Sequence, residues 1–310
     1  MKTDAANKLI NMKVFAAGGV GDHFIFVGGA QFTPEPLTII QSFQKFIAKP
    51  LIPPQWSLGW HQCRWGYNDT AKMRAVVQSY KDEELPLDAM WNDIDYLKDY
   101  RSFTYNKDFG FADLGEFVNE LHNQSLKYVP ITDSAIAMRP PGPDRSQWYF
   151  PYLLTDNFKA FIKDYKGDNF VGMVWPNDAV YMDWFHPEAA HLWRGFIQEL
   201  YEQVPFDGIW LDMNEASNFC YGSCYADQEA PLSSQDTLIY HPTGRDLRDH
   251  SISLEATHVN KWTELDVHSL FGHMSAHATS TWFELNQNNR RKMIISRSGG
   301  PGTTRFASRW

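Results

Sequence analysis

Short apolar runs alternate with helical patterns of apolar residues from about residue 55 onward. The runs predict strands, mostly buried, at residues 56–63, 87–96, 128–136, 171–175, 206–213 and 293–296. Between the first two runs, apolar side chains recur at the spacing of one helix face, at Met73, Val76, Val77 and Tyr80. Strands that alternate with amphipathic helices imply crossover units around a parallel sheet.

The sequence predicts three more helices. A stripe of apolar residues predicts one between the second and third strands, at Leu114, Phe117, Val118 and Leu121. Pro187 is expected at the first position of the next helix, which runs to about residue 203. Its predicted inner face consists of Leu192, Trp193, Phe196, Ile197 and Leu200. The last helix covers roughly residues 268–283.

A parallel sheet can stay open or close into a barrel, and two features favour the barrel. The first strand is not followed by the glycine-rich phosphate turn of a dinucleotide-binding sheet. Polar residues also gather at the carboxyl ends of successive strands, where a (β/α)₈ barrel keeps its chemistry. These residues are Arg64, Asp93, Asp95, Asp133, Asp212, Glu215 and Arg297.

The strand pattern also predicts the domain organisation. Residues 51–310 are expected to form an α/β unit, the first part of a (β/α)₈ TIM barrel, with about five of the eight strands. Residues 1–50 differ, because Val14, Phe15 and Phe24–Val27 are separated by glycine pairs, and they are expected to end a preceding β domain and form a linker. The chain is therefore expected to be a middle segment of a longer protein. Alone, with open sheet edges, it is expected to be poorly soluble or partly unfolded.

Composition narrows the ligand class. The aromatic share of 15%, with 12 Trp, supplies rings that either fill a core or stack on sugar faces. A net charge of -9 without a Lys/Arg cluster argues against a nucleic-acid partner. No apolar run is long enough to predict a membrane span, and the first residues lack the apolar core of a signal peptide.

Cysteines and glycosylation sequons give a weak indication of compartment. Cys63, Cys220 and Cys224 are too few for a disulfide-built scaffold. The pair Cys220 and Cys224 could close a small loop in an oxidising compartment or remain two free thiols. Asn68-Asp-Thr and Asn123-Gln-Ser match the N-glycosylation sequon, a short pattern that often arises by chance. Together these features only hint at a secretory route.

Carboxylates at strand ends are the main candidates for chemistry. Asp212 follows an apolar strand and suits one member of a glycosidase carboxylate pair, although an Asp that caps a turn fits the pattern as well. Asp93 and Asp95 lie two apart and, on an extended chain, would project to one face with Trp91. Such a pair could bind a polyol or a divalent metal, or simply be solvated; the nearby Trp favours a sugar. His273 and His277 lack the Glu of a zinc-protease helix, so neither a metal site nor a cofactor is expected.

Taken together, the motifs resemble one family. "WLDMNEASNF" (residues 210–219), "WSLGWHQCRWGY" (56–67), "LDAMWNDIDYL" (87–97), "VWPNDAVYMDW" (174–184) and "IISRSGGPGTTRFASRW" (294–310) are similar to motifs of glycoside hydrolase family 31. Within it the chain looks most like α-glucosidases of the lysosomal and intestinal maltase type. The resemblance implies a retaining exo-α-glucosidase, lysosomal or secreted, with an N-terminal β-sandwich ahead of its barrel and an α-glucosidic oligosaccharide as substrate.

The resemblance also assigns roles to residues. Asp212 matches the catalytic nucleophile, at the top of the fourth barrel strand, and Glu215 a nearby acid of the same signature. Asp93 matches the residue that holds hydroxyls of the terminal glucose, and Arg297 an active-site arginine. The remaining matches line the glucose pocket, with the acidic one at its floor: Trp65, Ile131, Trp175, Met213 and Asp133.

One part of the family pattern is not met. The last motif of the family continues into an Asp that serves as general acid/base, whereas this sequence ends at Trp310, just short of it. Arg309 also replaces a usual His, and Gly299-Gly300 a usual Thr-Phe. Because general acid catalysis contributes about 10² to 10⁴-fold, the isolated chain is expected to be inactive. Two alternatives remain: a catalytically silent sugar- or protein-binding remnant, or an α-xylosidase or transglucosidase of the same family.

Overall fold

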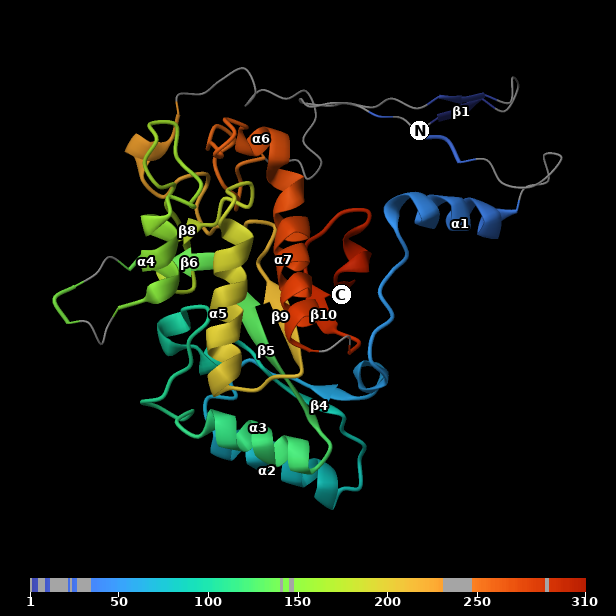
Figure 1. The fold of residues 1–310 in the computed structure, drawn as a ribbon, viewed down its shortest axis with the longest axis vertical. Coiled ribbons are helices and arrows are strands. Elements are labelled where there is room, and N and C mark those ends of the chain that lie inside the picture. The colour runs from blue at the N-terminus through green and yellow to red at the C-terminus, as the bar shows by residue number, and fades with distance from the viewer. Residues whose placement is uncertain are drawn as a thin grey trace.

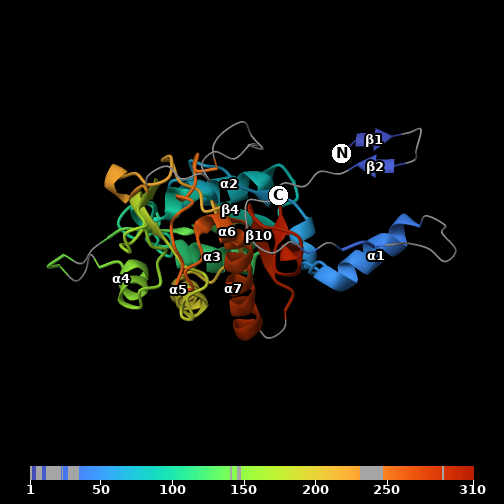
Figure 2. The same ribbon diagram turned by 90° about the horizontal axis from the view of Figure 1, so that it is seen from above.

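The structure is a computed structural model that describes residues 2–4, 9–11, 22, 24–26, 35–139, 142–144, 148–230, 247–287 and 290–310. Near the N-terminus, β1 (Lys2–Asp4) pairs antiparallel with β2 (Leu9–Asn11), and α1 spans Pro36–Ile47. These elements lie to one side of the main body (Figures 1 and 2). Val14, Phe15, Val27 and the glycine pairs lie outside the described residues. The assignment of residues 1–50 to a preceding β domain stays a prediction.

The main sheet has six strands in the order β11-β10-β9-β5-β4-β3. Every neighbouring pair is parallel, and the sheet curls into a partial barrel, so the predicted incomplete (β/α)₈ barrel is confirmed. Its strands are β3 (His61–Gln62), β4 (Ala89–Asn92), β5 (Lys127–Asp133), β9 (Gly208–Asp212), β10 (Met293–Ser296) and β11 (Ser308–Arg309). The short β11 has too few residues to show an apolar pattern and was not predicted. In chain order β9 is the fourth strand of this sheet, as predicted.

The first two predicted strands are shorter than expected. Residues Gln55–Leu58 form a 3₁₀ turn, so only the end of the predicted strand 56–63 is extended. In the second, β4 ends at Asn92, and a 3₁₀ turn covers Ile94–Tyr96. Asp93 starts this turn because its carboxylate accepts a hydrogen bond from the amide of Ile94 at 2.7 Å. Asp93 and Asp95 therefore do not project from one extended strand, and that prediction was wrong.

A second sheet of three antiparallel strands takes up the predicted run 171–175 and the end of the run 128–136, whose first part forms β5. Its strands are β6 (Ala135–Ala137), β7 (Gly172–Val174) and β8 (Asn177–Tyr181), in the order β6-β8-β7. The run 171–175 thus forms a strand, but outside the barrel sheet. The reason is local, since Val174 pairs with Asn177 across a tight hairpin whose Asn177 has a φ of 70°.

The predicted helices form and cover the outside of the sheet (Figure 1). They are α2 (Thr70–Asp82), α3 (Leu114–Asn123), α5 (Ala189–Gln203) and α7 (Phe271–Asn286), joined by α4 (Phe150–Asn157) and α6 (Glu264–Val267). Asp69 caps α2 by accepting a hydrogen bond from the amide of Lys72 at 2.5 Å. Pro187 was misplaced, because α5 begins at Ala189 and the proline lies in the turn before it. Short 3₁₀ turns cover Lys98–Tyr100, Ala226–Gln228, His268–Leu270 and Thr303–Arg305.

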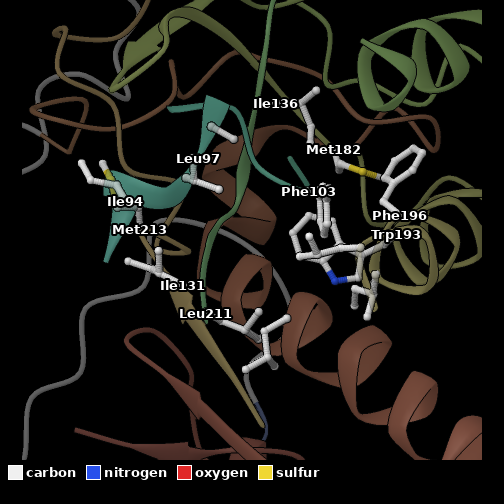
Figure 3. Packing of buried hydrophobic residues seen from close by; sticks show 14 of the residues in the cluster. Ile94, Leu97, Phe103, Ile131, Ile136, Met182, Trp193, Phe196, Leu211 and Met213 are labelled. Carbon is white, nitrogen blue, oxygen red and sulfur yellow. The ribbon is translucent and has the colours of Figure 1, made fainter. Parts of the chain in front are cut away.

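The hydrophobic core lies between the sheet and these helices. Trp193 of α5 is fully buried and meets the ring of Phe103 edge-on at 4.8 Å. The indole of Trp193 donates a hydrogen bond to Thr279 Oγ1 on α7 at 2.9 Å, which satisfies its polar atom within the core. Figure 3 shows these rings beside Leu211 of β9 and Phe196 of α5. No helix in the described ranges has the length and apolar character needed to cross a membrane.

Candidate active site

The strand register places the candidate residues on the inner face of the curled sheet. Asp133 of β5 pairs directly with Asp212 of β9, and Ile131 pairs with Trp210. Because side chains alternate along a strand, Trp210 and Asp212 share one face, while Ile209 and Leu211 face the helices. Arg297 follows the residue of β10 that pairs with Leu211, so it continues the same inner line as Asp212. The strand register therefore brings Asp133, Asp212 and Arg297 to the same edge of the sheet, at the carboxyl ends of its strands.

Arg297 links two carboxylates. Its Nη1 atom lies 3.0 Å from Oδ1 of Asp212, while Nε and Nη2 donate to Glu215 at 2.9 to 3.1 Å. Ser217 Oγ donates a further hydrogen bond to Glu215 at 2.9 Å. Asp212 is the more enclosed acid, with 14% of its side chain exposed against 39% for Glu215. One guanidinium therefore holds Asp212 from one side and fixes Glu215 through both of its oxygens.

The turn after β9 has an unusual backbone that buried contacts hold in place. Met213 and Ala216 adopt φ values of 54° and 67°, in the left-handed region that non-glycine residues rarely occupy. Asn214, at the centre of the turn, donates hydrogen bonds to Ser296 Oγ at 2.8 Å and to Ser275 Oγ at 3.1 Å. Its oxygen accepts from the amide of Ser298 at 2.9 Å. Asn214 thus ties the turn to β10 and α7, which fixes where Asp212 and Glu215 point.

Asp212 and Glu215 differ in how easily they ionise. Burial raises the pKa of Asp212, and the neighbouring charge of Arg297 opposes this without cancelling it. Burial would also raise the pKa of Glu215, but its hydrogen bonds to Arg297 and that guanidinium's charge outweigh it, and the pKa is lowered. Glu215 is therefore a fixed anion, and Asp212 is an acid whose ionisation depends on its surroundings.

Asp133 is the most buried acid at this edge. It is 2% exposed, and within the described part of the chain neither of its carboxylate oxygens has a hydrogen-bond partner. Burial, followed by the nearby charges of Asp212 and Asp93, raises the pKa of Asp133 to about 8. A carboxyl group that stays protonated at neutral pH can donate a hydrogen bond to a ligand oxygen.

Asp93 and Asp95 take different positions. Burial raises the pKa of Asp93, and the nearby Asp95 adds to this, while its own hydrogen bond from Ile94 opposes it. Its charge also acts on Asp133 and Asp212, which places Asp93 at the same edge of the sheet. Asp95 instead accepts a hydrogen bond from the amide of Gly66 at 2.8 Å, so it anchors the loop after β3. Only Asp93 of this pair belongs to the site.

The other candidate residues are two tryptophans with exposed rings and two enclosed apolar residues. Trp65 is 62% exposed, and its ring centroid lies 5.8 Å from that of Trp175, which is 38% exposed. Trp175 in turn meets Phe219 edge-on at 5.1 Å. Ile131 and Met213 are almost fully buried and lie near Ile94 at one side of the core cluster (Figure 3). Trp65 and Trp175 therefore have exposed ring surface that a ligand could contact, whereas Ile131 and Met213 are enclosed.

The structure shows the partners of the cysteines and of the two helix histidines. Cys220 and Cys224 form a disulfide, and Cys63 is a free, exposed thiol. His273 accepts or donates a hydrogen bond with Thr303 Oγ1 at 2.9 Å, and the ring of His277 packs on Phe306 at 4.6 Å. In the described residues, no group of three or more His, Cys, Asp or Glu side chains is arranged to hold a metal ion.

Sequence reasoning missed several residues of this region. Asn214 and Ser217 fix the turn, and their place inside the motif with Asp212 was the available signal. A row of buried side chains, Asp183, His258 and Glu264, that ends at the partly exposed His268 was also missed. The four-residue spacing of Glu264 and His268 could have indicated a pair on one helical turn, but His258 and Asp183 come from distant segments.

Comparisons with known proteins point the same way. The family described as "Glycosyl hydrolases family 31 TIM-barrel domain" matches residues 50–310. Lysosomal alpha-glucosidase of Rattus norvegicus is 37% identical over 297 residues, which cover 95% of this chain and 30% of that protein. Alpha-xylosidase 1 of Arabidopsis thaliana is 32% identical over 321 residues, covering 94% of this chain and 33% of that protein. The chain thus spans about a third of the length of these curated relatives.

A solved structure shows the same fold. The crystal structure of ER glucosidase II, a heterodimeric complex of a catalytic subunit and the binding domain of a regulatory subunit, matches with a TM-score of 0.72 at 25% identity. The match covers 90% of this chain and 27% of that chain. Within the part that is covered, the partial barrel sheet and its helices therefore follow an arrangement already seen by crystallography.

Proposed function

The chain belongs to glycosyl hydrolase family 31, and we propose that it supplies the nucleophile side of a retaining α-glucosidase site. The substrate is a terminal, non-reducing, α-linked glucose of an oligosaccharide, cleaved by the protein that carries this chain. The observation that carries this proposal is the cluster in which Arg297 holds Asp212 at 3.0 Å and grips Glu215 at the carboxyl end of the barrel strands.

In the proposed reaction Asp212 attacks the anomeric carbon of the glucose. A glycosyl ester forms as the glycosidic C–O bond breaks, and the leaving oxygen takes a proton from a general acid. Water then cleaves the ester, gives a proton to the same group and releases glucose with its configuration retained. The residues described here are assigned the roles of substrate binding and nucleophilic attack.

The surrounding residues suit these steps. Arg297 favours the ionised form of Asp212, which a nucleophile requires. Asp93 and the buried Asp133 offer carboxyl groups for the glucose hydroxyls, because one can accept and the other, when protonated, can donate hydrogen bonds. Trp65 and Trp175 offer exposed ring faces for the sugar's C–H surface.

An activated substrate tests the nucleophile directly. 5-Fluoro-α-D-glucosyl fluoride releases fluoride, which needs no proton from a general acid, and leaves a long-lived glycosyl ester on the attacking residue. Mass spectrometry of peptides from the treated chain should find the fluoroglucosyl group on Asp212. The variant Asp212→Asn should stay unlabelled, whereas Asp207→Asn, at the other end of the same strand, should label. Labelling of another residue, or none in a folded protein, would refute the assignment.

A second candidate is an α-xylosidase of the same family. The similarity to Alpha-xylosidase 1 of Arabidopsis thaliana, at 32% identity, favours it. The W-L-D-M-N-E signature around Asp212 favours the glucosidase instead, since the xylosidase type usually carries a different sequence there. Parallel labelling with 5-fluoro-α-D-xylosyl fluoride separates the two, because the better substrate should label Asp212 faster at equal concentration.

A third candidate is a sugar-binding protein without turnover. It is motivated by Arg309, which replaces a usual His of the family and donates to the backbone oxygens of Arg297, at 2.9 Å, and of Gly299. Isothermal titration with maltose would then show binding by a chain whose Asp212 stays unlabelled.

A further inference from the structure

A small loop closed by a disulfide follows the turn at the end of β9. We call it the disulfide loop; it runs from Asn218 to Cys224, and the disulfide joins Cys220 to Cys224. Asn218 is 1% exposed, so its polar side chain needs partners within the protein. Its side-chain nitrogen donates to the backbone oxygen of Gly222, which lies between the two cysteines, and to that of Ser251 at 3.1 Å. The donor end of the asparagine is therefore fixed.

The acceptor end of Asn218 holds the edge of the second sheet. In that sheet β7 is an outer strand, with β8 as its neighbour. The amide of Met173, in the middle of β7, donates to Asn218 Oδ1 at 2.8 Å, and the oxygen of Met173 accepts from the amide of Phe219 at 2.8 Å. The amide of Cys224 donates to the oxygen of Val171 at 3.3 Å. The disulfide loop thus satisfies backbone groups that an outer strand would otherwise leave unpaired.

The contact between the loop and the hairpin of β7 and β8 is close. A Cβ on Gly172 would lie 2.8 Å from Asn218 Oδ1 and 2.7 Å from the hydroxyl of Tyr181, so this approach requires a residue without a side chain. The hydroxyl of Tyr181, on β8, donates to the oxygen of Ser217 at 2.9 Å. Both strands of the hairpin are therefore bonded to the segment that follows the turn after β9.

This contact determines the position of Trp175. Trp175 directly follows β7 and lies two residues beyond Met173, whose backbone is bonded to Asn218. The ring of Trp175 meets that of Phe219, from the disulfide loop, edge-on at 5.1 Å and lies 5.8 Å from the ring of Trp65. The disulfide loop therefore contacts both the main chain before Trp175 and its ring, while 38% of the residue stays exposed.

We propose that Asn218 is a positioning residue that holds Trp175 in place for the substrate, and that the disulfide between Cys220 and Cys224 keeps its acceptor Gly222 in place. The inference rests on the proposed function, in which Trp175 contacts the sugar. Such a contact acts on the bound substrate and the transition state alike. Its loss therefore raises the substrate concentration that gives half the maximum rate and leaves the maximum rate nearly unchanged.

The first test reads the contact itself and needs no catalysis. Hydrogen–deuterium exchange of the peptide that contains Met173 is followed by mass spectrometry in wild type, Asn218→Ser and the matched control Asn123→Ser. Asn123 is an exposed residue at the end of α3. Serine is too short to reach the Met173 amide, so its exchange should become about tenfold faster in Asn218→Ser and stay unchanged in the control. Equal exchange in all three proteins would overturn the proposal.

The second test asks whether Asn218 acts through Trp175. The rate at which 5-fluoro-α-D-glucosyl fluoride labels Asp212 is measured against its concentration in wild type, both single variants and the double variant. Trp175→Ala should raise the half-saturating concentration about tenfold and Asn218→Ser about fivefold, with maximum rates within about twofold of wild type. The double variant should resemble Trp175→Ala alone, because a ring that has been removed cannot be misplaced. Independent effects, which would multiply to about fiftyfold, or a lower maximum rate in Asn218→Ser would contradict the proposal.

A milder change gives the same test if Asn218→Ser does not fold. Cys220→Ser combined with Cys224→Ser leaves Asn218 in place and releases only the loop that carries Gly222. The half-saturating concentration should rise about twofold, and this rise should disappear when Trp175→Ala is added. No rise, or a rise that persists in full without the Trp175 ring, would count against the proposal.

These tests separate failure of the inference from failure of the proposed function. If Asp212 is not labelled in the wild type, the proposed function fails, and hydrogen exchange still decides whether Asn218 holds β7. If Asp212 is labelled but Trp175→Ala has no effect, or the effects of the two variants are independent, the nucleophile stands and Asn218 does not position Trp175 for the substrate.

Discussion

Strand β9 has an aspartate at each end, and the two differ in their hydrogen-bond partners and in the direction of their pKa shifts. Asp207, just before the strand, accepts hydrogen bonds from His122 at 2.7 Å, from Lys127 at 3.0 Å and from the amide of Tyr128 at 3.0 Å. These bonds outweigh burial and lower the pKa of Asp207. Asp212, at the other end, has one ion pair, between its Oδ1 and Arg297, which is not aligned as a hydrogen bond, and burial raises its pKa.

The difference follows from what surrounds each end of a barrel strand. At the amino end, Asp207 joins β9 to α3 and β5 through its three donors, so its charge contributes to holding the layers together. At the carboxyl end the neighbours of Asp212 are other acids, Asp133 and Asp93, and a single arginine. Paired charge stabilises a fold, whereas incompletely paired charge is available to a ligand. The amino end of β9 is therefore organised for stability and the carboxyl end for chemistry.

The largest effect should come from replacing the carboxylate of Asp212, at the carboxyl end of β9. Asp212→Asn should reduce the labelling rate by at least about 10³-fold, because the amide cannot act as the nucleophile. Its free energy of unfolding should stay equal or rise, since an incompletely paired buried charge is removed. The rate of fluoride release tests the expected loss of labelling, and denaturant unfolding tests the expected stability. A clear loss of stability in this variant would contradict the division between the two ends.

Asp207→Asn should show the reverse pattern. We expect a loss of about 3 kcal/mol in the free energy of unfolding at pH 7, because Lys127 loses its partner, with the labelling rate per folded molecule unchanged. The folded-state pKa of Asp207 is lowered, so its contribution is present above the unfolded pKa of about 4 and is lost as pH falls through the folded value. Urea unfolding at pH 7 and pH 3 should therefore show the two proteins converging at the lower pH.

The sequence predicted the parallel sheet and its outer helices well, for a physical reason. The stripes on α3 and α5 are repeated signals, and each of their predicted residues, from Leu114 to Leu200, is buried. The short strands were harder, because β3 and β11 each contain two residues and are defined by hydrogen bonds to neighbours distant in sequence. Asp93 was placed on an extended strand because the pattern does not show that its side chain would start a turn.

The sequence predicted which residues form the site better than it predicted their burial and ion pairing. Asp212, Glu215 and Arg297 were selected from motifs, and the structure brings them into contact. The sequence could not reveal that Asp133 is 2% exposed, nor that Glu264 lies between two histidines, because burial and pairing depend on segments far apart in the chain.

Asp133 tests how much an unpaired buried carboxylate at the carboxyl end of the strands destabilises the fold. Its pKa of about 8 lies above the unfolded value, so its own contribution to stability is greatest below about pH 4 and is lost as pH rises from there through 8. Asp133→Asn should therefore exceed wild type in the free energy of unfolding by about 3 kcal/mol at pH 6, roughly two pH units above the unfolded pKa, and show little gain at pH 4. Thermal and urea unfolding at both values measure this. A gain that is independent of pH would show that the charge of Asp133 is not the cause.

The smallest effect should come from replacing His122, one of the three hydrogen-bond partners of Asp207. His122→Gln keeps a donor near Asp207 and leaves the bonds from Lys127 and Tyr128 in place, so a loss of about 0.5 to 1 kcal/mol in unfolding free energy is expected. In the double variant with Asp207→Asn the two losses should not add, because both remove the same contact. The labelling rate of Asp212 should be unaffected in each. If His122→Gln instead slowed labelling, the two ends of β9 would be coupled, and stability and chemistry could not be assigned to separate ends of the strand.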